Sequence, residues 1–222
     1  MSNKLTESVL FLGKKDDLYC DRALKFVEDN FRHVTSYYSE WGKPMPEDIR
    51  HWRGDYIISY LCRWVIPVHT IEAAEKGAIN FHPASPDYPG IGCNNYALYD
   101  NAAEYGATCH YMAGKVDTGR IIAVKRFPVF PTDDVSSLLQ RTYEFQLVLF
   151  YEVIGKLLDG KPLPESPEHW TRPPRTRQEF NELMTISPDM TEDEVARRVR
   201  ATSYGIFQPS VDIGGFRFEL KV

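Results

Sequence analysis

The stretch that decides the fold is Ala78–Ile122, AINFHPASPDYPGIGCNNYALYDNAAEYGATCHYMAGKVDTGRII. It opens with an apolar strand pattern that ends in the run Asn80-Phe81-His82-Pro83. Because side chains alternate along a strand, Asn80 and His82 lie on the same face. Pro83 cannot donate to a β-ladder, so we expect the strand to stop there and to leave His82 at its mouth.

A candidate carboxylate lies further along the same stretch. Asp117 lies in the glycine-flanked turn Gly114–Gly119, just before another apolar run. An amide, an imidazole and a carboxylate at strand ends are suited to general-base catalysis with oxyanion stabilisation. Taken alone, Asp117 could simply close an Asx turn, and a single histidine at a strand end is more often structural.

Length and composition indicate an ordinary globular protein. The 222 residues can bury one sizeable core and carry a small appendage, and a formal charge of −5 argues against a large nucleic-acid footprint. Four cysteines without a CxxC pair predict reduced thiols and no metal site. No apolar run is long enough to span a bilayer, and Met1–Gly13 lacks the apolar stretch of a signal peptide. We therefore expect a cytoplasmic protein that binds neither nucleic acid nor membrane.

Apolar runs and helical periodicity alternate through the first part of the chain. Strands are expected at residues 8–12, 33–38, 56–61, 79–82, 107–112 and 120–127. Helices are expected at residues 18–31, 71–76 (closed by Gly77), 94–105 and 135–158, the last capped by Thr132 or Ser136. This alternation indicates an α/β fold with a three-layer sheet. Gly13 is followed by Lys14 and Lys15, so the first strand carries no glycine-rich phosphate loop.

The composition changes at Lys161. Five prolines between positions 162 and 174 predict a linker without regular structure. Thr191 and Glu194 have the spacing of a capping box and should open a short helix. A glycine pair within Asp212–Leu220 predicts a β-hairpin. We expect a main domain over residues 1–160 and a tail of linker, helix and hairpin over residues 161–222.

Four pieces of the chain, taken in order, resemble the formyltransferase family, which moves a formyl group from 10-formyltetrahydrofolate to an amine. They are NFHP at 80–83, YPG at 88–90, GATCHY at 106–111 and DTGRII at 117–122. A single N-x-H would be weak, whereas the ordered set is specific. The resemblance implies a Rossmann-like three-layer sheet with the topology of that family, and residues 1–160 as its catalytic domain.

Asn80, His82 and Asp117 match the catalytic triad of the family. His82 would take the proton of the attacking amine, since an imidazole with a pKa near ~6.5 is largely neutral at pH 7. The Asn80 amide would donate to the tetrahedral oxyanion. Asp117 would either orient His82 or handle protons on the leaving nitrogen, and the sequence leaves both roles open. His110 is expected to make structural hydrogen bonds.

The resemblance also implies a folate co-substrate held partly by main chain, and no metal. The residues that it implies for this site are Arg63, Trp64, Val65, Ile66, Met112, Gly114 and Val116. Ordinary packing is an equally good interpretation of Trp64 and Ile66. Nothing pairs Cys93 or Cys109 with a base, so neither thiol is expected to act as a nucleophile.

Differences between this chain and other branches of the family narrow the choice of acceptor amine. We expect neither the barrel domain of the transfer-RNA branch, nor the phosphate loop of the glycinamide-ribonucleotide branch, nor the regulatory domain of formyltetrahydrofolate hydrolases. The short sugar N-formyltransferases are the most similar, because Arg200–Tyr204 and the hairpin resemble their ending. That branch implies a dTDP-linked 4-amino-4,6-dideoxyhexose such as the gluco sugar, a homodimer built by the tail, and lipopolysaccharide O-antigen synthesis. Glycinamide-ribonucleotide formyltransferase and a non-catalytic folate- or nucleotide-binding module are the alternatives.

Cationic and aromatic side chains are expected to contact the nucleotide. The candidates for the pyrophosphate are Lys14, Lys15, Lys43, Arg172, Arg175 and Arg177. The candidates for stacking on the base are Trp41, Tyr204 and Phe207. Taken singly, residues of these types are more often solvated charges or core aromatics than ligand contacts.

Overall fold

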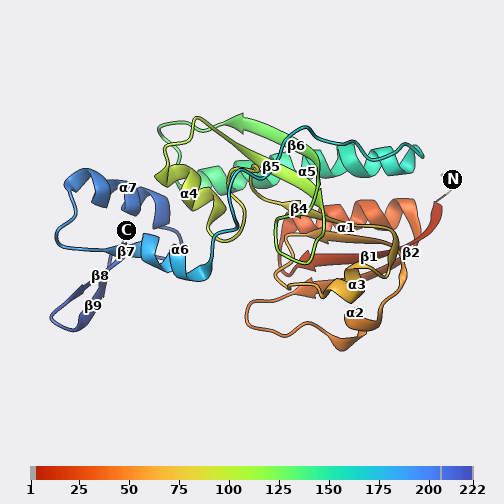
Figure 1. Cartoon of the computed structure of the whole chain (residues 1–222), viewed down its shortest axis with the longest axis horizontal. Coiled ribbons are helices and arrows are strands. Elements are labelled where there is room, and N and C mark those ends of the chain that lie inside the picture. Colours follow the sequence, from red (N-terminus) through yellow and green to blue (C-terminus); the bar gives the residue numbers. More distant parts are fainter. Residues whose placement is uncertain (1–3, 206, 222) are drawn as a thin grey trace.

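A six-stranded sheet forms the centre of the computed structural model, which describes residues 4–205 and 207–221 (Figure 1). Its strand order is β2-β1-β3-β4-β5-β6. The strands are β1 (Leu5–Lys14), β2 (Phe31–Ser39), β3 (Gly54–Tyr60), β4 (Ala74–His82), β5 (Glu104–Tyr111) and β6 (Ile121–Pro128). The first four are parallel, and β5 and β6 run antiparallel. The predicted α/β sheet is therefore confirmed, and its parallel and antiparallel parts meet at β4 and β5.

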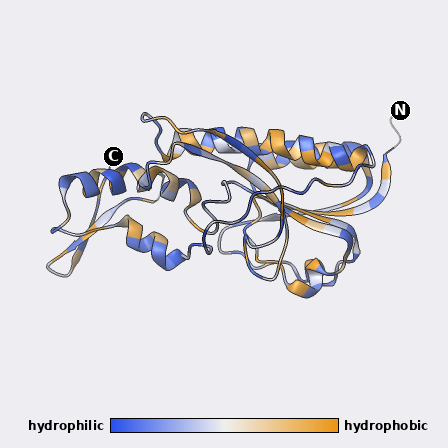
Figure 2. Ribbon diagram, turned by 45° about the horizontal axis from the view of Figure 1, so that its top comes forward, coloured by the Kyte–Doolittle hydropathy of each residue, from blue (hydrophilic) through white to orange (hydrophobic). Residues whose placement is uncertain are grey.

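Helices cover both faces of the sheet, giving three layers. One face carries α1 (Leu18–Asn30) and α5 (Val135–Leu158), and the other carries α2 (Glu47–His51) and α3 (Val68–Ile71) (Figure 1). Figure 2 shows the alternating hydrophobic and hydrophilic residues of α5, whose apolar side packs onto the sheet. The Gln146 amide of α5 also donates to the Phe81 carbonyl of β4 at 2.7 Å, which ties the helix to the strand that ends at the site.

The predicted bounds of α5 are confirmed, but its predicted caps are wrong. Asp134, rather than Thr132 or Ser136, is the N-cap, because its carboxylate accepts from the Ser137 amide and the Ser137 hydroxyl accepts from the Asp134 amide. Sequence alone offered several polar residues at this helix start, and their backbone angles decide among them.

Two short helices also differ from the prediction. The helix expected at residues 71–76 lies at Val68–Ile71, since Ala74 already pairs with Gly54 as part of β4. The helix expected at residues 94–105 is α4 (Cys93–Tyr99), and it ends before the left-handed residue Asn101. Pairing with a neighbouring strand overrides local helix propensity in both places.

The tail holds more regular structure than predicted. Residues 177–184, for which no element was predicted, form α6 (Arg177–Met184), whose start is a capping box between Thr176 and Glu179. The predicted short helix and hairpin are present as α7 (Glu192–Thr202), β8 (Ser210–Ile213) and β9 (Phe216–Glu219). A short strand, β7 (Thr185–Ile186), completes a second sheet. Ile206 and Val222, also in the predicted tail, lie outside the described residues, as do Met1–Asn3 at the other end.

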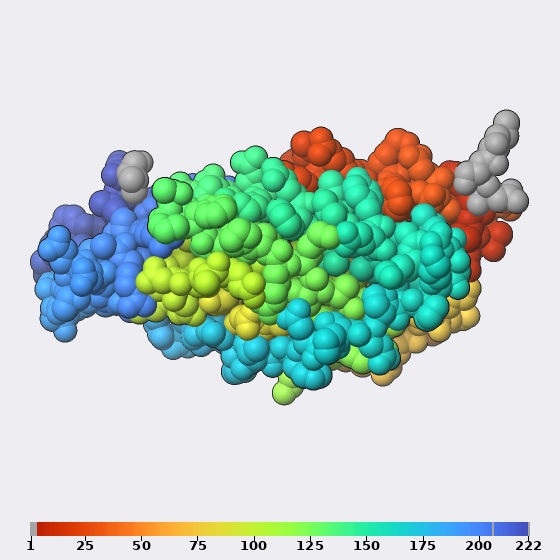
Figure 3. Space-filling view, turned by 90° about the horizontal axis from the view of Figure 1, so that it is seen from above, coloured from red at the N-terminus to blue at the C-terminus, as the bar shows by residue number. Residues whose placement is uncertain are grey.

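Residues 161–175, which we call the strap, return along the main sheet before α6 begins. Thr171 donates to the Pro86 carbonyl at 3.3 Å, and the main chain of Arg175 pairs with Pro89 and Ile91 at 3.0 Å. In Figure 3 this segment, cyan to blue, lies on the molecular surface beside the green and yellow atoms. The strap thus covers the loop that follows β4.

The helices of the tail share a core with α4. Phe180, Leu183 and Ala201 are buried with Tyr96 and Leu98 in one cluster. The Asn95 side chain donates to the Ala201 carbonyl at 2.6 Å. Within residues 4–205 and 207–221, no helix combines the length and apolarity needed to cross a bilayer.

Candidate active site

A cleft of about 320 Å³ lies where β1, β3 and β4 end. Carboxyl ends of parallel strands meet at one edge of a sheet, so residues after these strands converge there. Its lining includes Lys14 after β1, the segment Arg63–Ile66 after β3, and Asn80 and His82 on β4. The opposite wall is the loop between β5 and β6, including Asp117.

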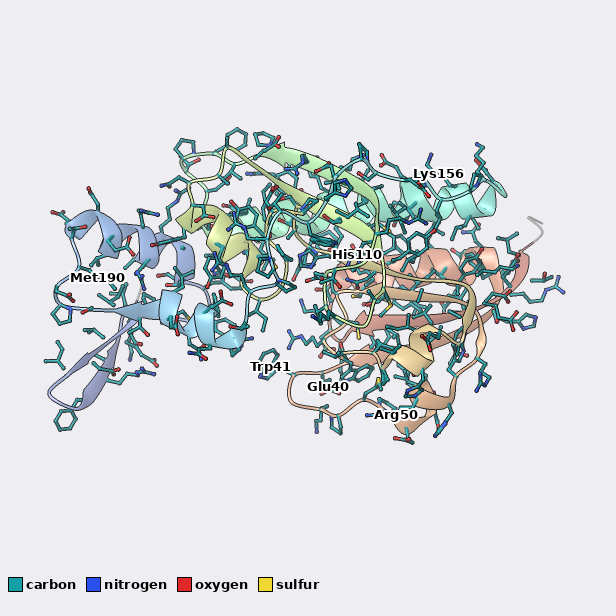
Figure 4. All side chains as sticks on the ribbon, viewed as in Figure 1. Glu40, Trp41, Arg50, His110, Lys156 and Met190 are labelled. Carbon is teal, nitrogen blue, oxygen red and sulfur yellow. The ribbon has the colours of Figure 1, made fainter. Side chains whose placement is uncertain are left out.

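Four polar side chains form a connected cluster in this cleft. Asp117 lies 3.4 Å from His82 Nδ1 through Oδ2 and 3.4 Å from His110 Nε2 through Oδ1. Asn80 Nδ2 lies 3.1 Å from the same His110 nitrogen. The amide, the imidazole and the carboxylate that were predicted to act together are therefore side by side, joined by His110, which Figure 4 labels near the centre of the molecule.

The register of β4 against β5 explains why His110 lies in the cluster. Asn80 and His110 are opposite each other in the antiparallel pairing of β4 and β5. A β-bulge between Cys109 and His110 interrupts the pairing with β6 at this position, and bulges re-aim side chains in this way. The predicted hydrogen-bonding role of His110 agrees with these contacts, but the sequence did not indicate that its partners would be Asn80 and Asp117.

The cluster is nearly excluded from solvent. His82, His110 and Asp117 are 5%, 3% and 4% exposed. Burial lowers the pKa of His82, outweighing the opposite effect of Asp117, so the imidazole is neutral at pH 7. Burial raises the pKa of Asp117, but the two imidazoles and the Gly90 amide outweigh it and bring the pKa to about 2. The site therefore combines a neutral base with a permanent carboxylate.

Hydrogen bonds set the protonation of His82. Its Nε2 lies 3.1 Å from the Tyr88 carbonyl, which can only accept, so Nε2 carries the proton. Nδ1, the nitrogen beside Asp117, is then free to receive one. The Gly90 amide donates to Asp117 Oδ2 at 2.9 Å, so the Tyr-Pro-Gly loop holds both the imidazole and the carboxylate.

The turn that carries Asp117 depends on close backbone approach. Asp117 itself is left-handed, with φ of 47°. A Cβ at Gly119 would lie 1.7 Å from the Tyr111 carbonyl oxygen, so only glycine fits there. The Asp-Thr-Gly order therefore has a steric reason as well as a chemical one.

The residues implied for the folate site all line the same cleft: Arg63, Trp64, Val65, Ile66, Met112, Gly114 and Val116. Among them, Val65 and Val116 are exposed and Ile66 is buried. The Trp64 indole donates to the Lys43 carbonyl at 3.0 Å, which anchors the loop after β2 to this wall.

Of the residues expected to bind the nucleotide, only Lys14 is among the described residues that line the cleft. Lys14 lines the cleft, paired with Asp17 at 2.8 Å and 5.1 Å from the Tyr143 ring centre. Burial alone would lower the pKa of Lys14, but Tyr143 and Asp17 raise it, so the amine stays charged.

Trp41 lies at the margin of the cleft, facing the tail (Figure 4). The guanidinium groups of Arg63 and Arg177 lie 5.1 and 5.4 Å from its ring centre. Phe207 packs on Phe180 in the tail, with ring centres 5.9 Å apart.

The remaining nucleotide candidates lie elsewhere. The main chain of Tyr204 pairs with that of Phe207, and its side chain is exposed. Lys15 pairs with Glu40, Arg172 with Asp100 and Arg175 with Glu179. Unlike Lys14, none of these four residues is among the described residues that line the cleft.

The two thiols nearest the site are poorly suited to nucleophilic chemistry. Burial raises the pKa of Cys93 to about 12 and the pKa of Cys109 well above its usual value. A protonated, buried thiol is inert. In the described part of the chain, no group of three acidic, histidine or cysteine side chains is placed to hold a metal ion.

Comparison with known proteins identifies the family of this chain. Residues 22–154 match the formyl transferase domain model. The chain therefore belongs to the formyl transferase family, as the resemblance implied.

Individual relatives point to more than one acceptor. The chain is 32% identical to a GDP-perosamine N-formyltransferase of Brucella melitensis over 162 residues, covering 71% of this chain and 60% of the relative. It is 27% identical over 160 residues to a methionyl-tRNA formyltransferase of Listeria monocytogenes, covering 64% of this chain and 51% of the relative. The chain thus spans about half the length of such curated relatives.

Solved structures share the fold over nearly the whole chain. A sugar N-formyltransferase from Shewanella sp superposes with a TM-score of 0.79 at 19% identity, covering 97% of this chain and 96% of that one. An N-formyltransferase from Helicobacter canadensis, solved with folinic acid and dTDP-3-aminofucose, superposes with a TM-score of 0.71 at 18% identity, covering 94% and 84%. The tail is therefore part of the shared architecture.

Proposed function

We propose that this protein transfers a formyl group from 10-formyltetrahydrofolate to the amine of a nucleotide-linked amino sugar. The observation that carries the proposal is the convergence of Asn80, His82 and Asp117 in one cleft. The amine nitrogen forms a bond to the formyl carbon, and the bond from that carbon to the folate nitrogen breaks. The proton lost by the amine balances the one gained by the leaving nitrogen.

His82 acts as the general base. It is neutral because burial lowers its pKa, and Nδ1 is the nitrogen without a proton. A proton that reaches Nδ1 arrives 3.4 Å from the Asp117 carboxylate. Asp117 thus stabilises the imidazolium only once it has formed, which favours the transition state over the ground state.

Asn80 stabilises the tetrahedral oxyanion. Its amide nitrogen carries two N–H groups, and the contact with His110 at 3.1 Å uses at most one of them. The other remains available to the oxyanion. Because the site is nearly closed to water, such a donor has a larger effect than it would in solution.

The cleft walls suit a folate. About 320 Å³ is at the lower end of the volumes of ligand sites. Val65, Ile66, Met112 and Val116 supply apolar surface for a flat ring, and the two wall segments supply main-chain polar groups. The Helicobacter N-formyltransferase of the same fold was solved with folinic acid, which supports a folate as the co-substrate.

A nucleotide-linked amino sugar is the acceptor favoured by the relative of 32% identity and by the solved structures that share the fold over nearly the whole chain. The Brucella relative is named for a GDP-linked amino sugar, and the Helicobacter structure holds a dTDP-linked one. In this chain we propose dTDP-4-amino-4,6-dideoxyglucose or a close analogue. Lys14 supplies positive charge inside the cleft, and Trp41 with Arg177 supplies an aromatic and cationic surface at its margin. A homodimer, a cytoplasmic location and O-antigen synthesis are parts of the same proposal.

The test is an acceptor panel with 10-formyltetrahydrofolate. Tetrahydrofolate release is followed with dTDP- and GDP-linked amino sugars, glycinamide ribonucleotide, methionyl-tRNA and no acceptor. We expect rapid release only with an amino sugar nucleotide. Release with only glycinamide ribonucleotide or only methionyl-tRNA would show that this compound, and not an amino sugar nucleotide, is the acceptor. Release without any amine would contradict transferase activity.

A further inference from the structure

The strap brings a tryptophan against the catalytic histidines. The Trp170 ring lies 5.8 Å from the His82 ring at 67° and 5.1 Å from the His110 ring at 87°, both in edge-to-face arrangement. Perpendicular aromatic rings at such distances attract each other. His82 and His110 come from different strands, so one side chain braces both.

The indole is itself held in place. Its Nε1 donates to the Gly119 carbonyl at 2.8 Å, in the turn that carries Asp117. Because this N–H is used, Trp170 offers the histidines no hydrogen bond, only its apolar ring. Trp170 therefore contacts β4 and β5 through the histidines and the Asp117 turn through the main chain.

An ion network holds the strap down beside Trp170. Arg126 of β6 pairs with Glu168 of the strap at 2.5 Å and with Asp87 of the loop after β4 at 3.0 Å. The main-chain pairs of Thr171 and Arg175 with the same loop continue the attachment. Two independent sets of contacts thus fix the strap at the residue that touches the site.

We propose that Trp170 is a positioning residue for the reaction: it sets the ring orientations of His82 and His110 toward Asp117 and keeps water away from them. Like the chemistry that it supports, this role rests on the proposed function. Because reaction rates respond steeply to small displacements, loss of the indole should lower kcat by about 10- to 100-fold. The KM for either substrate should change little, because the indole is not among the described residues that line the cleft.

A change in the titration of His82 should accompany the loss of rate. Asp117 raises and His110 lowers the pKa of His82, and burial has the largest effect. Glu168 of the strap and Asp87 of the loop after β4 pair with Arg126, as does Glu104, and none of the three is among the groups that shift the pKa of His82. Water admitted at position 170 would therefore raise the His82 pKa toward its ordinary value.

The experiment compares Trp170→Ala, Trp170→Leu and Trp170→Phe with His169→Ala, a change at the exposed neighbour. Steady-state kinetics give kcat and KM, and NMR of ¹³Cε1-labelled histidine gives the titration of His82, assigned with His82→Asn. We expect Phe to retain kcat within about 3-fold, and Leu and Ala to lose it with a raised His82 titration midpoint. If Ala does not fold, the contrast between Leu and Phe carries the test.

Unchanged kcat and unchanged titration in the Leu variant would overturn the proposal, as would equal losses in Leu and Phe. The NMR titration needs no acceptor. If the wild-type protein transferred no formyl group, the proposed function would fail while the effect of Trp170 on His82 could still be measured.

Discussion

The proposed catalytic cluster and the C-terminal hairpin are built in opposite ways. His82, His110 and Asp117 are at most 5% exposed and are linked through three separate parts of the main domain. In the hairpin of β8 and β9, by contrast, Phe216 and Phe218 are 71% and 55% exposed. A buried cluster allows few substitutions without loss of its contacts, whereas exposed apolar side chains on a hairpin are free to contact another surface. We infer that the chemistry is held by the sheet and that assembly depends on the tail.

The largest expected effect is on the base. His82→Asn should lower kcat by about 10²–10⁴-fold, the usual contribution of general acid–base catalysis. Thermal melting should stay close to that of the wild type, because an amide can still donate to the Tyr88 carbonyl. His33→Asn, at an exposed position of β2, is the matched control. Full activity in the His82 variant would show that another group accepts the proton.

Asn80→Ala should have the next largest effect. Removal of one oxyanion donor costs about 10²–10³ in kcat, with little change in KM because the interaction forms in the transition state. A parallel loss of folate affinity, measured by fluorescence titration, would instead assign Asn80 to ground-state binding.

Two glycines test whether the cluster depends on a tight backbone. Gly119→Ala should lower both the melting temperature and kcat, since its Cβ would meet the Tyr111 carbonyl at 1.7 Å. Gly155→Ala, in the last turn of α5 with nothing within 4 Å of the added Cβ, should raise the unfolding free energy by about 0.5–1 kcal/mol. Denaturant unfolding compares the two. Similar shifts in both variants would contradict the steric argument.

The pH profile should reveal the buried base. Because burial lowers the pKa of His82, the acid limb of kcat/KM should lie below the ordinary histidine value of about 6.5, with activity rising as pH increases through it. Asp117 has a pKa of about 2 and stays ionised throughout this range. An acid limb above 6.5 would mean that the protein stabilises the imidazolium form of His82, contrary to the expected effect of burial.

The smallest expected effect on catalysis comes from the hairpin. Replacing Phe216 and Phe218 together by Asp should convert a dimer to a monomer in light scattering, because exposed apolar patches of this kind mark protein interfaces. We expect kcat to stay within about 3-fold, since neither residue is among those lining the cleft in the described part of the chain. An unchanged mass would contradict the proposed dimer, and a large loss of kcat would contradict the separation of chemistry from assembly.

Sequence predicted the main sheet and the longest helix because long periodic segments bury a continuous apolar face, as α5 does. It predicted Asn80, His82 and Asp117 as partners, since alternation on a strand and a motif in order are local signals. It did not predict that His110 would join them, which depends on the register of β4 against β5. Trp170 gave no periodic signal at all, because its contacts arise from the path of an irregular segment.

The register of β4 and β5 has a consequence for folding. Side chains alternate, so a slip by one residue would turn His110 to the other face of the sheet and place Cys109 or Tyr111 opposite Asn80. A mispaired molecule would lack the cluster, because His110 would point away from Asn80 and Asp117. Active-site titration of refolded protein would then count only correctly paired molecules, so that enzymatic competence becomes a measure of folding fidelity.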